Sequence, residues 1–214
     1  MNITIVSSDS SHPVRGYLTK FIKEFCGVHD FNLVESIKHV QGGDMLFLVS
    51  CTEIVPEEIF RQYEKSFVLH ASDLPKGRGW SPHIWQILEG VSRITLSMIE
   101  VSKNVDFGRV WFKQNLLIPR HAIWNEINDI LFSAEIDLIR YAVENFELLE
   151  NEEQDQTISP TFYRKRTPND SELDISKSIE EQFDLLRVCD PIRYPAYFEI
   201  RGHRYTLKLE KYYK

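Results

Sequence analysis

Short apolar runs that alternate with helical segments constrain the fold of this chain more than any other feature. Residues 44–50, DMLFLVS, form a continuous apolar run, which is typical of a central parallel strand that is buried on both faces. A β-branched run at residues 2–7 and the run at 66–70 predict two further strands, and residues 31–37 are a weaker strand candidate. Helices that are predicted to begin at Pro13 and Pro56 separate these strands. The alternation therefore predicts βαβ units and an α/β fold with a largely parallel sheet.

The second half of the chain has a different pattern. A short helix is predicted over residues 82–89, and two β-rich segments, 94–101 and 108–118, flank a turn. Apolar residues at three- and four-residue steps then predict a long amphipathic helix over 121–148. An acidic connector at 150–159 is expected to be a solvated loop, and the final residues predict a hairpin that turns at Gly202. These patterns divide the chain into a main domain, 1–150, and a small C-terminal subdomain, 151–214.

Composition excludes several classes of protein. The chain has 214 residues and a net charge of −7, which is enough for one core with a small appendage and argues against a large nucleic-acid footprint. No apolar run reaches the roughly 18 residues that span a bilayer, and the N-terminus lacks the basic start of a signal peptide. Three widely spaced cysteines and seven scattered histidines predict neither a disulfide framework nor a metal site. We expect a cytoplasmic protein without metal, membrane or nucleic-acid partners; a homodimer stays open.

Two polar side chains stand where an open α/β sheet places its chemistry. His70 ends the apolar run 66–70 and precedes a loop that is rich in Ser, Pro and Gly. Asp106 precedes Gly108 in another predicted turn, so the two side chains can converge. Taken alone, His70 has the simpler interpretation of a strand-end histidine bonded to a backbone carbonyl. Taken alone, Asp106 is an ordinary turn aspartate.

The segments around His70 and Asp106 together resemble the formyltransferase family that uses N10-formyltetrahydrofolate. Order, spacing and residue type agree at His70, Ala71, Ser72, Leu74, Pro75, Arg78, Gly79, Pro82, Trp85 and Gly90, and then at Thr95, Asp106 and Gly108. One position departs from the pattern, because Val68 stands where the family has Asn. The resemblance implies a Rossmann-like catalytic core, with a C-terminal appendage of helix and β-hairpin.

The resemblance also implies a mechanism of formyl transfer. His70 would stabilise the oxyanion, and Asp106 would orient His70 and help to take the proton that the attacking amine loses. The Asn of the family donates to the oxyanion, and loss of one such donor typically costs about 10²–10³ in rate. Valine donates nothing at position 68. Three replacements are open, namely Ser72, the Ser81 hydroxyl and a backbone N–H of the 76–80 loop. His83 is a fourth candidate, although a place on the helix surface is the favoured interpretation of that residue.

Folate and acceptor sites follow from the same resemblance. The pterin would lie in an apolar pocket and bond mostly to backbone; the residues assigned to it are Val49, Ser50, Cys51, Ile54, Val101 and Val105. Segments 163–174 and 185–207 resemble the tail of the sugar-nucleotide branch of the family, in which Arg193 would help to hold a diphosphate. The residues assigned to the acceptor are Ser72, Lys76, Arg78, Trp80, Arg187, Tyr194 and Tyr197. A purely structural role, in which the tail arginines and tyrosines pack against the main domain, is equally compatible with the sequence.

The predicted activity is transfer of a formyl group to the amine of a nucleotide-linked 4-amino-4,6-dideoxy sugar. A UDP-linked sugar of a pseudaminic-acid pathway, used for surface polysaccharide, fits the resemblance best. The alternative is a weakened or inactive binding protein with the same fold, which Val68 favours. A third hypothesis keeps His70 and Asp106 and uses another small acyl donor.

Overall fold

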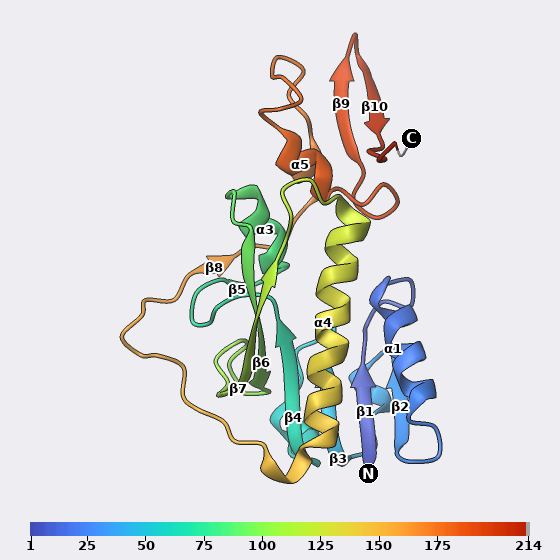
Figure 1. The fold of residues 1–214 in the computed structure, drawn as a ribbon, viewed down its shortest axis with the longest axis vertical. Coiled ribbons are helices and arrows are strands. Elements are labelled where there is room, and N and C mark those ends of the chain that lie inside the picture. Colours follow the sequence, from blue (N-terminus) through green and yellow to red (C-terminus); the bar gives the residue numbers. More distant parts are fainter. Residues whose placement is uncertain (213–214) are drawn as a thin grey trace.

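The computed structural model describes residues 1–212 and is built around one six-stranded sheet (Figure 1). Its strand order is β2-β1-β3-β4-β6-β7. Four neighbouring strands are parallel: β2 (Asp30–Val34), β1 (Asn2–Val6), β3 (Gly43–Leu48) and β4 (Tyr63–His70). Two antiparallel strands complete the edge: β6 (Arg93–Glu100) and β7 (Val110–Leu117). The predicted α/β class with a parallel-rich, Rossmann-like sheet is confirmed.

Burial of the central strand β3 on both faces explains its continuous apolar sequence. Met45 and Phe47 point into the large core cluster, which also contains residues of α1 (Val14–Glu24) and α4 (Trp124–Glu144). Leu46 and Leu48 point to the other face and join a smaller apolar cluster. Because both faces of the strand are covered, neither set of side chains meets solvent, and the period-two alternation of a half-exposed strand is absent.

The remaining elements mostly follow the predicted order, with shifts at their ends. The long helix is shorter than the predicted range 121–148, because the Glu126 carboxylate accepts the Ile123 N–H at its start and a 3-10 turn, η2 (Phe146–Leu148), follows its end. The helix after Pro56 is a single turn, α2 (Glu57–Phe60). The strand predicted over 31–37 ends at Val34, because Glu53 accepts hydrogen bonds from Ser36 and Ile37 and holds the next residues in η1 (Ile37–His39).

The C-terminal segment returns along the main domain (Figure 1). After α4 the chain runs in extended form to β8 (Phe162–Tyr163), which pairs in parallel with β5 (Arg78–Gly79). It continues through η3 (Pro168–Ser171) to α5 (Phe183–Val188), which contacts both α4 and α3 (Pro82–Leu88). The predicted hairpin is formed by β9 (Ala196–Ile200) and β10 (His203–Leu207), with Gly202 in its turn. The domain boundary near residue 150 stays a prediction.

Candidate active site

A cavity of about 730 Å³ opens beside the carboxyl ends of β1, β3 and β4. Residues after β1, after β3 and at the end of β4 line it, together with side chains from α3, α4 and the C-terminal segment. Open α/β sheets bind ligands at this edge because the strands end there and their loops diverge. Both His70 and Asp106 line the cavity.

The structure brings His70 and Asp106 together, as predicted. Nδ1 of His70 lies 3.6 Å from Oδ1 of Asp106, and both side chains are buried. Nε2 of His70 lies 2.9 Å from the carbonyl oxygen of Gly77. A carbonyl only accepts, so Nε2 carries a proton in this contact and the Nδ1 edge faces the carboxyl group. That approach is attractive when one further proton lies between the ring and the carboxyl group, so the pair is arranged to hold and release a proton.

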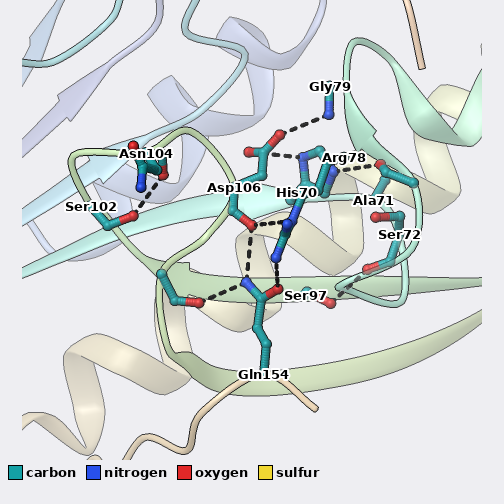
Figure 2. A network of polar contacts seen from close by, with 12 residues as sticks. His70, Ala71, Ser72, Arg78, Gly79, Ser97, Ser102, Asn104, Asp106 and Gln154 are labelled. Atoms are coloured by element: carbon teal, nitrogen blue, oxygen red, sulfur yellow. Dashed lines mark hydrogen bonds and ion pairs between the residues drawn. The ribbon is translucent and has the colours of Figure 1, made fainter. Parts of the chain in front are cut away.

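Asp106 is fixed from three sides (Figure 2). Its carboxylate accepts the Gly79 N–H at 2.8 Å, and its carbonyl accepts Nε of Arg78 at 3.0 Å and Nε2 of Gln154 at 2.9 Å. The Asp106 backbone has a φ of 62°, a region that non-glycine residues rarely adopt, so these bonds maintain a conformation that costs energy. Arg78, which was assigned to the acceptor, is instead buried under Phe107 and does not line the cavity.

Gln154 is a site residue that the sequence did not reveal. Besides Asp106 it donates to the carbonyl of Gly108 at 2.8 Å, and its Oε1 accepts from Arg78 at 2.6 Å. The acidic connector 150–159 was predicted to be a solvated loop, but Gln154 is only 4% exposed. The prediction was wrong at this position because local composition does not record which single side chain the fold turns inward.

Two glycines of the motif are required by close backbone contacts. A Cβ at Gly79 would lie 2.2 Å from the carbonyl oxygen of Tyr163, where β5 meets β8. A Cβ at Gly108 would lie 1.8 Å from the carbonyl oxygen of Glu100. The motif Trp85 also has a local purpose, because its Nε1 donates to the carbonyl of Arg164 and its ring stacks on Tyr163.

Val68 lines the cavity on the same face of β4 as His70, and the structure narrows the search for a replacement donor. Each backbone N–H of the 76–80 loop already has an acceptor: Asp73 O for Lys76, Thr161 Oγ1 for Gly77, Thr161 O for Arg78, Asp106 Oδ2 for Gly79 and Tyr163 O for Trp80. A donor from that backbone is therefore ruled out in this conformation. Ser72 is buried away from the cavity, whereas Ser81 lines it.

Two histidines line the cavity that were not assigned to it. His83 was expected on the helix surface, but burial and the nearby positive charge of Arg166 lower its pKa to about 4. Burial and Arg193 lower the pKa of His12 to about 4 as well. Both rings are neutral at pH 7, so each offers one N–H and one acceptor nitrogen to a ligand.

Glu135 of α4 is a further polar group in the cavity wall. Its side chain is 6% exposed, and burial raises its pKa to about 8. Within residues 1–212, its buried Oε2 has no hydrogen-bond partner. Glu135 lies on the buried face of the amphipathic helix, between Leu131 and Leu138. The helical period therefore predicts that the side chain is buried, but it does not explain why that side chain is a carboxyl group.

The residues assigned to folate mostly lie together. Ser50, Cys51 and Ile54 after β3, and Val101 and Val105 after β6, all line the cavity. Val49 does not, because it is fully buried in the main core. With the exception of Val49, the residues assigned to folate therefore line one cavity. The Val49 side chain packs in the core and does not face the cavity.

The residues assigned to the acceptor divide into two groups. Trp80 and Tyr194 line the cavity, whereas Ser72, Lys76, Arg78, Arg187 and Tyr197 do not. Arg187 is 2% exposed, and its guanidinium donates to Asp184 and to the carbonyls of Pro119 and Ala122. In this structure it packs the C-terminal segment against the main domain and lies outside the cavity. The hydroxyl of the buried Tyr197 donates to Glu172 within the tail.

Three other cations reach the cavity, namely Lys165, Arg166 and Arg193. Of these, only Arg193 was considered from the sequence, as a possible diphosphate ligand. Arg193 donates to Asp9 at 2.7 Å and so ties the C-terminal segment to the loop after β1. Within residues 1–212 there is no group of three or more side chains that could hold a metal ion, and no helix is long and apolar enough to cross a membrane.

Residues 16–142 match the formyl transferase family. A methionyl-tRNA formyltransferase from Fusobacterium nucleatum is 26% identical over 166 residues, covering 76% of this chain and 53% of the relative. The chain spans about half the length of the curated relatives it matches.

Solved structures agree with this match. A methionyl-tRNA formyltransferase from Clostridium thermocellum superposes with a TM-score of 0.81 at 24% identity, over 95% of this chain and 90% of that one. A 4-N formyltransferase from Francisella tularensis superposes with a TM-score of 0.77 at 14% identity, over 100% and 98%. At these identities the superpositions establish the fold. The match to the family covers more than half of this chain, so the chain belongs to the formyl transferase family.

Proposed function

We propose that this protein transfers a formyl group from N10-formyltetrahydrofolate to the amine of a nucleotide-linked amino sugar in the cytoplasm. The observation that carries the proposal is the buried His70–Asp106 pair, 3.6 Å apart, in the same cavity as the residues assigned to folate. Members of this family use N10-formyltetrahydrofolate as the formyl donor.

The chemistry follows from the arrangement of these groups. The neutral acceptor amine attacks the formyl carbon, a C–N bond forms, and the carbonyl oxygen becomes an oxyanion. The attacking nitrogen loses a proton to the His70–Asp106 pair, and N10 of the folate leaves with a proton as its bond to the formyl carbon breaks. Ser81 and the neutral ring of His83 are the candidate donors to the oxyanion in place of the missing Asn, because both line the cavity.

Two observations support a nucleotide-linked acceptor. Arg166, Arg193 and Tyr194 of the C-terminal segment line the same cavity as His70, so a small ligand can touch the tail and the catalytic pair together. A sugar N-formyltransferase from Shewanella superposes over 100% of this chain with a TM-score of 0.73 at 15% identity, which favours a sugar as the acceptor. The second candidate acceptor is methionyl-tRNA, which the curated relatives favour. The net charge of −7 weighs against it, because RNA binding relies on contacts between cations and phosphates.

A direct assay tests the proposal. The purified protein is incubated with N10-formyltetrahydrofolate and, separately, with UDP- and dTDP-linked 4-amino-4,6-dideoxy sugars and with methionyl-tRNA. Formylated sugar, detected by mass spectrometry, is the expected product. Formylation of the tRNA alone would replace the sugar as acceptor. Folate binding without turnover of any acceptor would instead support the inactive binding protein that Val68 suggests.

A further inference from the structure

Within residues 1–212, Arg166 is a buried cation without an anionic partner. Its side chain is only 8% exposed, and Nη2 donates to the carbonyl of Asp170 at 3.3 Å and to Oγ of Ser171 at 3.1 Å. Its Nε is buried and has no hydrogen-bond partner among residues 1–212, and no carboxylate there lies within ion-pair distance of it. A buried charge normally costs several kcal/mol unless an opposite charge or enough hydrogen bonds compensate for it.

The neighbouring arginines show how unusual this is. Arg164, two residues earlier, makes a two-point ion pair with Asp170. Arg187 pairs with Asp184, and Arg193 pairs with Asp9. Buried Arg78 lacks a carboxylate too, but its Nε and Nη2 are bonded and it does not face the cavity. Of these five arginines, Arg166 is the one that lines the cavity with a buried nitrogen that has no hydrogen-bond partner within residues 1–212.

The surroundings of Arg166 suit an anion. Lys165 lies over the Trp80 ring, 4.5 Å from its centroid, and both residues line the cavity. Arg166 lies over the ring of Tyr194, 5.6 Å from its centroid. Among the carboxyl groups that line the cavity, Asp9 accepts from Arg193 and Asp190 accepts the backbone N–H groups of Ile192 and Arg193. Burial raises the pKa of Glu135 to about 8, so that carboxyl group is neutral at pH 7.

We infer that Arg166, assisted by Lys165, binds a phosphate group of the acceptor, and that this group is part of a nucleoside diphosphate. The inference rests on the proposed function and adds the residues that recognise the acceptor. An anion would supply the missing partner of Nε through a charge-assisted hydrogen bond, and a planar guanidinium suits phosphate oxygens. A small ligand is favoured over RNA because Arg166 lies inside the cavity rather than on an exposed basic face.

Calorimetric titration with UDP and with inorganic pyrophosphate tests the inference. Arg166→Met keeps an unbranched apolar stem and removes the guanidinium with its charge, and Lys165→Ala is the second variant, at an exposed position. Arg120→Met is the matched control, because Arg120 is exposed and does not line the cavity. We expect Arg166→Met to weaken binding of both ligands by about 10-fold to 100-fold, the range of a hydrogen bond to a charged group. Lys165→Ala should weaken it less, and Arg120→Met should leave it unchanged.

The outcomes separate this inference from the proposed function. Equal affinity for UDP in the parent protein and in folded Arg166→Met would overturn it. If the protein bound a 5′-phosphorylated RNA oligonucleotide through Arg166 and did not bind UDP, the assignment of the ligand as a nucleoside diphosphate would be overturned. Loss of UDP binding in Arg166→Met would support the phosphate site even if no amino sugar were turned over, in which case only the proposed acceptor would fail. Where turnover is observed, Arg166→Met should raise the KM for the sugar nucleotide and leave the KM for the folate unchanged.

Thermal melting supplies an independent readout. If Arg166 served only to hold the fold, its replacement would lower the melting temperature. If Arg166 instead binds a ligand, its uncompensated buried charge lowers the stability of the unliganded protein. Arg166→Met should then melt at the same temperature as the parent or at a higher one. UDP should raise the melting temperature of the parent protein and not that of the variant.

Discussion

The two ends of the cavity differ in how their polar groups are satisfied. Around Asp106, donors from Arg78, Gly79 and Gln154 are all paired, so the carboxylate is held rigidly beside His70. Elsewhere in the cavity lining, which we call the acceptor end, Glu135 and Arg166 are buried with polar atoms that have no partner within the described part of the chain. A satisfied network fixes geometry for chemistry, whereas unsatisfied buried groups lower stability until a ligand completes them. The difference suggests that the catalytic end is preorganised and that the acceptor end is completed by substrate.

The largest effect is expected at the preorganised end. Asp106→Asn should fold and lose about 10²–10⁴ in kcat, because an amide neither takes a proton nor stabilises an imidazolium. His70→Ala should abolish turnover, because alanine has no ring nitrogen that can take or donate a proton. Rates come from the formyl-transfer assay, and melting curves serve as the control for folding. Near-normal activity in either folded variant would remove that residue from the mechanism.

Gln154 tests whether the network around Asp106 matters for catalysis. Gln154→Leu removes the two hydrogen bonds that Nε2 donates to the carbonyls of Asp106 and Gly108, and it removes the Oε1 that accepts from Arg78. We expect a loss of about 1–3 kcal/mol in the free energy of unfolding and a smaller kcat, with KM for both substrates nearly unchanged. Gln156→Leu is the comparison, since Gln156 bonds only to the carbonyl of Gln154. A destabilised Gln154→Leu with full kcat would make the network purely structural.

Glu135 should make the acceptor end sensitive to pH. Its folded-state pKa of about 8 lies above its ordinary value of 4.5, so the native state holds the proton more tightly and stability falls as pH rises through that window. Glu135→Gln removes this dependence and should raise the free energy of unfolding at pH 7 by up to about 3 kcal/mol, with little change at pH 4.5. Denaturant unfolding at several pH values measures it. Identical slopes of stability against pH in variant and parent would contradict the prediction.

Val68→Asn is expected to have the smallest effect on rate. Val68 packs in an apolar cluster with Leu74, Ile99 and Val110, which offers an amide no partner on that side. If Ser81 or His83 already serves the oxyanion, the substitution costs about 1–3 kcal/mol of stability and brings no rate gain. Single-turnover kinetics with melting curves decide the matter. A large increase in rate would mean that the natural protein is a weakened relative with an incomplete oxyanion site.

The sequence by itself determined the α/β class, the parallel core and the meeting of His70 with Asp106. These features have local signals. The run DMLFLVS is apolar because β3 is covered on both faces, and Gly79 and Gly108 are glycines because backbone carbonyls lie where a Cβ would stand. A motif of this kind can be recognised from the sequence alone, because the backbone conformation and burial at each position determine the residue type there.

Only the tertiary structure decided which polar side chains face the cavity. Gln154 reaches Asp106 across 48 positions of sequence, and Arg166, His12 and Glu135 come to one cavity from three separate segments. Arg187 and Arg166 have the same chemistry and lie in the same tail, yet one anchors the tail against Pro119 and Ala122 and the other faces the cavity. The physical reason is that burial and hydrogen-bond partners depend on how distant segments pack, and neither residue type nor local period records that packing.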